Sequence, residues 1–320
     1  MRTAPRWLWG LLALVVLLLT LEGIQRVRHP HVGFRGMTNS LGFRGPEFNP
    51  TKDPGTLRIF FLGSSTTFGV NNPVEKTYPF LAGQMLREAW PGRKIETVNA
   101  ALPNKTSFWM VERFELILAF EPDVLVLLAG YNDSASVHQS SVKIGRKGEL
   151  VLTPWYFRLN GYLARYSVFY VTLREKISLL LYGTPRFAFA APHAIARGEA
   201  LEQTEWFRYY PGYYRENLRK IAEIAREHQV KLLFLKPPLS AERRRGYPLY
   251  TRAFERLLEE LIRVSQEESI PIVDLDALSS APRSTAYFSE DGLHFSDAGN
   301  AVIARSVADA LLAHAREFFP

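Results

Sequence analysis

The sequence predicts an α/β protein in which a parallel sheet lies between two layers of helices. Two observations support this: short runs of consecutive apolar residues alternate with longer amphipathic segments, and several of these runs end at Gly, Asn or Asp. Strands that are apolar throughout are typical of parallel sheets, which are buried on both faces. Their alternation with helices predicts repeated β-α-β units. We therefore expect a three-layer α/β/α fold with a doubly wound sheet in the flavodoxin-like arrangement.

Five strands are expected, and the first leads into the stretch around which the chain is organised. It ends at Gly63, and a loop of hydroxyl residues beginning with Ser64 and Ser65 follows. The strands are expected at residues 57–62, 94–98, 123–129, 230–235 and 270–274. Helices are expected at residues 75–90, 106–120, 213–229, 249–268 and 296–318. Because parallel strands end at the same edge, the loops that follow them should meet where such folds bind ligands.

The alternation of strands and helices is interrupted between residues 134 and 212, a segment rich in tyrosine, tryptophan and phenylalanine. We predict an aromatic-rich helical insertion there, with two interpretations open. Insertions after the carboxyl edge of a sheet commonly form lids over the site. Aromatic stripes also pack against one another and fill the small core of such an insertion.

The first 24 residues have the charge order of a signal sequence, because Arg2 and Arg6 precede the uncharged apolar run 7–21. No small-residue cleavage site follows, which favours an uncleaved single-pass membrane anchor with the domain on the outer face. A cleaved signal peptide that leaves a secreted or periplasmic domain is the alternative. Residues 25–56 are rich in proline and glycine and are predicted to form a turn-rich tether. The main domain is then expected over residues 57–318.

Composition narrows the classes of function. A chain of 320 residues with 47% hydrophobic and 22% charged residues is typical of globular proteins. The net charge of +7 has no accompanying nucleic-acid motif, so we expect a solvated surface that could favour anionic lipid. Cysteine is absent, which excludes disulfides, thiolate zinc sites and a cysteine nucleophile. No cluster of His, Asp and Glu has metal-ligand spacing, so neither metal nor other cofactor is expected.

The strongest candidates for chemistry are a serine and a nearby Asp-His pair. Asp291 and His294 are three residues apart, so one turn can place the carboxylate against an imidazole nitrogen. The other nitrogen could then take a proton from a serine, for which Ser65 is the candidate. The competing interpretation of Ser65 is a hydroxyl that caps a helix. Asp297, at the start of the last helix, is interpreted as a cap rather than a catalytic acid.

A serine that accepts an acyl group also needs hydrogen-bond donors for the developing oxyanion. Three candidates follow strand ends: the Ser65 N–H, a backbone N–H within residues 99–104, and the side-chain amide of Asn132. An Asx-turn or a helix cap is the alternative role for Asn132 and Asp133.

Spacing excludes two other active-site motifs. An α/β-hydrolase elbow needs glycine two residues after the serine, where Thr67 stands. A phosphate-binding P-loop needs Gly-Lys-Ser/Thr, whereas Phe68-Gly69-Val70 follows here.

These blocks together resemble those of the SGNH/GDSL hydrolase (lipase/esterase) family. Residues 63–69 are similar to the family's Gly-Asp-Ser-x-Thr-x-Gly block, residues 130–133 match Gly-x-Asn-Asp, and residues 291–294 match Asp-x-x-His. The resemblance extends over about residues 57 to 316.

The resemblance implies a role for each matching residue. Ser65 would be the nucleophile, His294 the base and Asp291 the acid that orients it. Ser65 N–H, Ala101 N–H and Asn132 would form the oxyanion hole. The chain departs from the family's blocks at two positions, because Ser64 replaces the usual Asp and Ala101 replaces the usual Gly. The Cβ of Ala101 could crowd the acyl group or restrict its loop.

We therefore expect a serine hydrolase that cleaves esters through an acyl-enzyme, acting on O-acyl groups of envelope carbohydrate or on lipid esters. Two alternatives remain. An O-acyltransferase of the same fold would resolve the acyl-enzyme with a sugar hydroxyl. A catalytically inactive, membrane-tethered scaffold would explain the two departures, but not the intact Ser, Asp, His and Asn set.

Overall fold

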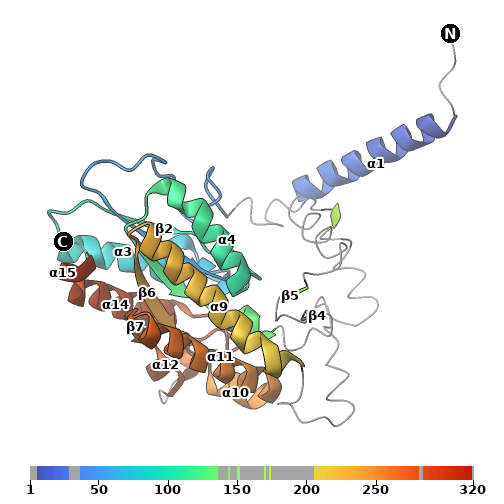
Figure 1. Ribbon diagram of the computed structural model, residues 1–320. Helices are drawn as coiled ribbons and strands as arrows, with labels where there is room; N and C mark the ends of the chain where they lie inside the picture. Colours follow the sequence, from blue (N-terminus) through green and yellow to red (C-terminus); the bar gives the residue numbers. More distant parts are fainter. Residues whose placement is uncertain are drawn as a thin grey trace. The chain divides into compact units, whose positions relative to one another are not determined.

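The computed structural model describes residues 6–28, 37–135, 143–144, 150–151, 169–170, 173, 205–280 and 284–318. The chain divides into two compact units, one with helix α1 (Arg6–Arg28) and one with the sheet and its helices (Figure 1). Helix α1 begins directly after Pro5 and ends two residues before Pro30, so it extends into the predicted tether.

None of the helices that can be described is both long enough and apolar enough to pass through a lipid bilayer. The predicted anchor in residues 1–24 has no support from this structure, and the predicted location outside the cytoplasm stays a prediction.

The predicted five-stranded parallel sheet is confirmed, and each strand lies within two residues of its expected position. Its strands are β1 (Leu57–Gly63), β2 (Ile95–Asn99), β3 (Val124–Leu128), β6 (Lys231–Lys236) and β7 (Ile272–Asp274). Their order is β2-β1-β3-β6-β7, and every neighbouring pair is parallel. The chain reverses its direction of winding at β1, so the carboxyl end of β1 is the switch point where doubly wound sheets bind ligands. A separate antiparallel pair is formed by β4 (Lys143–Ile144) and β5 (Leu150–Val151).

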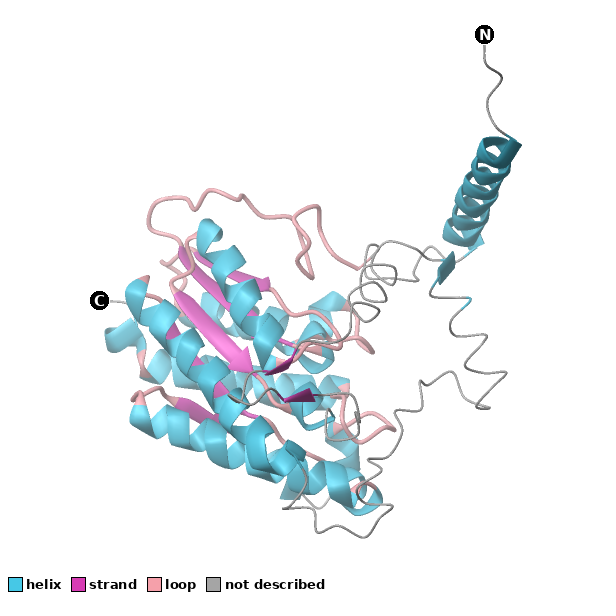
Figure 2. Cartoon of the chain, turned by 45° about the vertical axis from the view of Figure 1, so that its right-hand side comes forward, coloured by secondary structure: helices cyan, strands magenta, loops and turns pink. Residues whose placement is uncertain are grey.

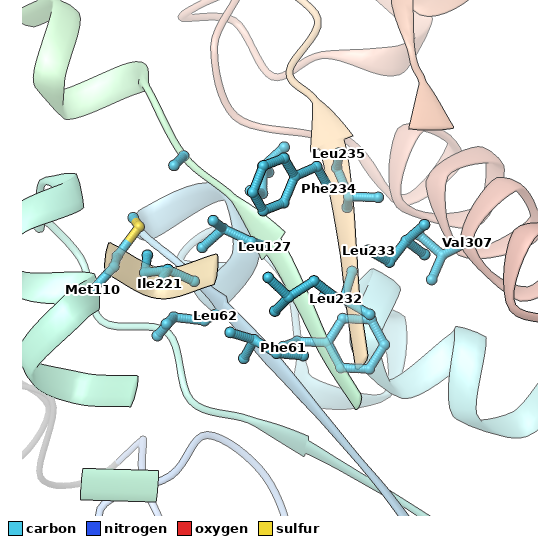
Figure 3. Packing of buried hydrophobic residues seen from close by; sticks show 14 of the residues in the cluster. Phe61, Leu62, Met110, Leu127, Ile221, Leu232, Leu233, Phe234, Leu235 and Val307 are labelled. Atoms are coloured by element: carbon cyan, nitrogen blue, oxygen red, sulfur yellow. The ribbon is translucent and has the colours of Figure 1, made fainter. Parts of the chain in front are cut away.

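Helices cover both faces of this sheet (Figure 2). Helices α3 (Tyr78–Ala89) and α14 (Asp297–Ala313) pack together on one face, and α4 (Ser107–Ile117), α9 (Glu205–Glu227) and α11 (Pro248–Glu267) pack on the other. Successive residues of a strand point to opposite faces, so each strand contributes to both cores. Leu62 lies near Met110 of α4 and Ile221 of α9 (Figure 3), whereas the Phe61 ring contacts Tyr78 of α3.

Short helices follow most strand ends, where they carry polar side chains to the carboxyl edge. Helix α2 (Ser65–Phe68) follows β1, α5 (Tyr131–Ala135) follows β3, α10 (Ala241–Gly246) follows β6 and α12 (Asp276–Ser280) follows β7. The remaining short helices are η2 (Val74–Lys76), η3 (Leu118–Phe120), α13 (Ser284–Tyr287) and α15 (Ala315–Phe318).

Helix α9 begins eight residues earlier than residue 213, where the sequence predicts it. It continues through Pro211, and Trp206, Tyr210 and Tyr214 are buried along one side of it. The rings of Trp206 and Tyr210 stack with centroids 5.1 Å apart. Burial of three aromatic side chains offsets the cost of an internal proline, about 3 kcal/mol. These aromatics therefore pack in the core, while most of the predicted insertion lies outside the described residues.

Candidate active site

The turn after β1 presents Ser65 at the carboxyl edge of the sheet. A Cβ on Gly63 would lie 2.1 Å from the Thr67 hydroxyl and 3.0 Å from the Leu128 carbonyl oxygen, so only glycine fits there. Ser65 is the first residue of α2, and the N-cap position belongs to Ser64, whose side chain makes no capping hydrogen bond. The structure therefore does not place the Ser65 hydroxyl in the capping role.

The structure brings Ser65, His294 and Asp291 into one hydrogen-bonded chain. His294 Nε2 lies 2.8 Å from Ser65 Oγ, and His294 Nδ1 lies 2.5 Å from Asp291 Oδ2. The other oxygen of Asp291 accepts the backbone N–H groups of Leu293, at 2.9 Å, and His294, at 3.0 Å. Four hydrogen bonds thus hold a serine, an imidazole and a carboxylate in the order that nucleophilic catalysis requires.

The charge of Asp291 determines which imidazole nitrogen carries the proton. Burial by itself raises the pKa of this carboxyl, but the hydrogen bonds from the His294 ring and from the N–H groups of His294 and Leu293 outweigh it and hold the pKa well below its usual range. An ionised carboxylate only accepts hydrogen bonds, so it pairs with a proton on Nδ1. Nε2 of the neutral ring is then free to accept the proton of Ser65.

The loop after β2 lies beside the turn that carries Ser65. Ala100 N–H donates to the Phe61 carbonyl at 2.8 Å, and Leu102 N–H to the Gly63 carbonyl at 3.4 Å. Between them, Ala101 N–H donates to the Asn99 side-chain oxygen at 3.2 Å. The predicted oxyanion donor at Ala101 is therefore near the site, with its N–H already paired.

Asn132 also has a hydrogen-bond partner within the protein. One N–H of its amide donates to the Lys105 carbonyl at 3.0 Å. An amide group carries two N–H bonds, so the second is not used by this contact. The side chain is half-buried on α5, directly after β3 and Gly130, at the same sheet edge as Ser65. Asn132 therefore keeps one N–H that could donate to an oxyanion. The Ala101 N–H could do so only after breaking its hydrogen bond to the Asn99 side chain.

The neighbouring Asp133 has a structural role that the sequence did not reveal. It is fully buried, and both of its carboxylate oxygens lie 3.0 Å from the Ser107 N–H, which donates to them. The hydroxyls of Ser107, at 2.6 Å, and Tyr210, at 3.3 Å, also donate to this carboxylate. Asn217 of α9 donates to the Ser107 hydroxyl at 2.9 Å. Asp133 thus fastens the start of α4 and the middle of α9 to the short helix that carries Asn132. Burial raises the pKa of Asp133 to about 6, although the hydrogen bonds from Ser107 and Tyr210 oppose this.

Replacing Asp133 with asparagine is expected to flatten the pH dependence of stability between about pH 4 and pH 7. An unfolded aspartate titrates near 3.9, so the folded protein binds more protons across this interval. The free energy of unfolding of the wild type should therefore fall by about 2–3 kcal/mol as the pH rises through it. Urea unfolding at each pH measures the slope. Asp309→Asn, which replaces an exposed carboxylate on α14, is the matched control and should keep the wild-type dependence of unfolding free energy on pH. If Asp133→Asn also keeps that dependence, Asp133 is not the group that causes it.

A second buried residue links the two halves of the site. Asn300 of α14 is fully buried, accepts the Tyr78 N–H at 3.0 Å and donates to the Asn72 side chain at 3.2 Å. The helix that follows His294 is thereby tied to the segment that follows Ser65. The available signal was an asparagine on the apolar face of α14, where an unpaired amide would be costly.

The prediction that Asp297 caps the last helix is wrong by one residue. The cap of α14 is Ser296, whose hydroxyl accepts Gly299 N–H at 3.2 Å. Asp297 is exposed and instead contacts Asn72 at 3.0 Å and forms an ion pair with Lys76. Sequence cannot separate two adjacent capping residues, because the choice depends on which one leaves helical geometry. In the part of the chain that is described, no group of three or more acidic or histidine side chains could hold a metal ion.

Comparison with solved structures finds matches at low sequence identity. A lipase/acylhydrolase from Enterococcus faecalis is 18% identical with a TM-score of 0.49, and the match covers 81% of this chain and 96% of that one. An acetylxylan esterase from Geobacillus stearothermophilus is 14% identical with a TM-score of 0.49, and the match covers 80% of this chain and 94% of that one. A psychrotrophic esterase from Pseudoalteromonas sp. is 13% identical with a TM-score of 0.47, and the match covers 81% of this chain and 98% of that one. No curated protein matched the chain.

The comparison with protein families gives a match that spans most of the domain. Residues 61–302 match the GDSL-like lipase/acylhydrolase family, and this range contains Ser65, Asn132, Asp291 and His294. The match confirms the resemblance noted from the sequence blocks. The chain therefore belongs to the GDSL-like lipase/acylhydrolase family.

Proposed function

We propose that this protein is a serine esterase that cleaves carboxylic esters through an acyl-enzyme on Ser65. The observation that carries the proposal is the 2.8 Å contact between Ser65 Oγ and His294 Nε2, with Asp291 hydrogen-bonded to the opposite ring nitrogen. A nucleophile, its base and the group that orients the base are thus within hydrogen-bond reach of one another.

The proposed reaction begins when Ser65 Oγ attacks the ester carbonyl carbon and His294 Nε2 takes its proton. The carbonyl oxygen becomes negative and accepts hydrogen bonds from the Ser65 N–H and the second N–H of Asn132. Asp291, ionised and bonded to Nδ1, stabilises the imidazolium that forms. His294 then returns the proton to the leaving alcohol, and the acyl group stays on Ser65. A water molecule, deprotonated by His294, releases the acid and restores Ser65.

We also propose that the ester belongs to the cell envelope, either as an O-acyl group on carbohydrate or as a lipid ester. Its support is the order of basic and then apolar residues at 1–24, which is typical of sequences directed to the envelope. The net charge of +7 would add attraction to an anionic surface. Release of acyl groups from acylated polysaccharide, compared with release from phospholipid vesicles, distinguishes the two substrate classes.

Labelling with a fluorophosphonate probe tests the proposed chemistry directly. The probe reacts with a serine only when a base activates it, so we expect the full chain to be labelled on Ser65, as identified by peptide mass spectrometry. The same preparation should hydrolyse p-nitrophenyl acetate. Ser306→Ala is the control and should label normally. It removes an α14 serine whose hydroxyl donates to the Val302 carbonyl within the same helix. A chain that is folded but neither labelled nor active would be a scaffold, and the proposal would fail.

A further inference from the structure

The segment after β6 lies against the loop that carries Asp291 and His294. Strand β6 lies between β3 and β7, so its carboxyl end lies between the strand that precedes Asn132 and the strand that precedes the Asp-His loop. Ser240 N–H donates to the Gly292 carbonyl at 3.4 Å. A Cβ on Gly292 would lie 2.3 Å from the Ser240 hydroxyl and 3.2 Å from the Cβ of Arg243. The Cβ and backbone N of Arg243 are therefore packed against Gly292, the residue that follows Asp291.

The guanidinium of Arg243 lies over two aromatic rings. Its Cζ lies 3.8 Å from the ring centroid of Tyr247 and 5.2 Å from that of Tyr250. Within the described residues, Arg243 pairs with no carboxylate, and its buried Nε has no hydrogen-bond acceptor. The next two arginines along the helix do form ion pairs, Arg244 with Glu255 and Arg245 with Glu242.

Tyr250 connects this arginine to the loop that carries Asn132. Tyr250 is buried, and its hydroxyl donates to the Tyr131 carbonyl at 3.1 Å, one residue before Asn132. The ring that supports the guanidinium is thus fixed to α5. Arg243 therefore lies between the loop of Asn132 and the loop of Asp291 and His294, at the edge of the sheet where Ser65 is presented.

We propose that Arg243 binds an anionic group of the ester substrate, a carboxylate or a phosphate, and so selects anionic esters over neutral ones. This inference rests on the proposed esterase activity. A guanidinium offers a planar fork of donors that matches the oxygens of either anion. Contact with two aromatic rings restricts the guanidinium before substrate arrives. None of the described carboxylates pairs with it, so its charge is available to a ligand.

A pair of esters that differ in one charge tests this inference. The probes are p-nitrophenyl pentanoate, which is neutral, and mono-p-nitrophenyl glutarate, which carries a carboxylate on a chain of similar length. The quantity compared is the ratio of kcat/KM for the anionic ester to kcat/KM for the neutral ester. In Arg243→Gln this ratio should be at least tenfold lower than in the wild type, mainly because KM for the anionic ester rises. Arg243→Lys keeps the charge without the fork and should be intermediate. Competitive inhibition by glutarate and by inorganic phosphate shows which anion is preferred.

The matched control is Arg245→Gln, which removes an exposed, paired arginine from the same helix and should leave the ratio unchanged. If Arg243 only supported the fold, Arg243→Gln would lower the melting temperature and reduce both activities equally. If the ratio in Arg243→Gln equals that of the wild type, whether or not both activities fall, the inference is overturned. If the wild type hydrolyses neither ester, the proposed esterase function fails, and this inference fails with it.

Discussion

Replacing Ser65 with alanine is expected to lower kcat for ester hydrolysis by about 10⁴ to 10⁶-fold. The reason is that Ser65 Oγ is the atom proposed to form the acyl bond, and alanine leaves His294 with no proton to take. The hydroxyl is half-buried, and the hydrogen bond recorded for it is the 2.8 Å contact with His294. Its loss should therefore leave stability almost unchanged. Steady-state kinetics with p-nitrophenyl acetate and thermal unfolding of the same preparation measure the two effects.

The adjacent serine supplies the matched control. Within the described part of the chain the His294 ring is hydrogen-bonded to Asp291 and Ser65 and not to Ser64. Ser64 also stands where the family has aspartate, so Ser64→Ala should stay within about tenfold of the wild-type kcat. Residues that act as one unit have non-additive effects. The double variant Ser65→Ala/His294→Ala should therefore be no slower than Ser65→Ala alone. Substantial turnover by Ser65→Ala would rule out Ser65 as the nucleophile.

Replacing Arg58 with methionine is expected to lower the free energy of unfolding by about 3–5 kcal/mol. Arg58 lies in β1 and is fully buried, where its guanidinium pairs with Glu96 at 2.8 Å. It also donates to three backbone carbonyls, those of Asn49 at 2.8 Å, Pro50 at 3.1 Å and Phe120 at 2.7 Å. Methionine fills the space but removes the donor from Glu96 and from these three carbonyls, and each lost hydrogen bond costs free energy.

Urea unfolding of three variants measures this contribution. Arg305→Met, at an exposed position of α14, is the control and should change stability by less than about 0.5 kcal/mol. Arg58→Lys keeps the charge near Glu96 but cannot reach all three carbonyls, so it should lie between the two. A loss below about 1 kcal/mol for Arg58→Met would show that the buried pair and its carbonyl contacts contribute little.

Patterns that are local in the chain were sufficient to predict the sheet. Apolar runs such as residues 124–128 indicate buried parallel strands, because a strand covered by helices on both faces buries every consecutive residue. The start of α9 could not be predicted in this way. It depends on Trp206 and Tyr210 finding a buried surface, and Pro211 carries the opposite signal in the sequence. The environment of Arg58 was equally hidden, since a charged residue is rarely buried without partners supplied by distant segments.

In the candidate site too, some contacts could be predicted from local spacing and others could not. Asp291 and His294 are three residues apart, so their contact is a property of one turn and follows from spacing. Ser65 is 229 residues from His294, and the sequence indicated their meeting only through the order of parallel strands and the family's blocks. The partners of Ala101 and Asn132 belong to tertiary structure alone, because a hydrogen bond depends on ångström-scale positions that residue patterns do not encode.

The sequence by itself determined the fold class, the family and the identity of the three proposed catalytic residues. Only the tertiary structure decided that the Ala101 N–H is already engaged and that buried Asp133 joins α4 to α5. It also decided that Arg243 lies beside the loop of Asp291 and His294 and, among the described residues, pairs with no carboxylate. The physical reason is the distance along the chain over which each kind of interaction acts. Periodicity and motif spacing report interactions within one element, whereas desolvation and hydrogen-bond satisfaction depend on every element packed around a side chain.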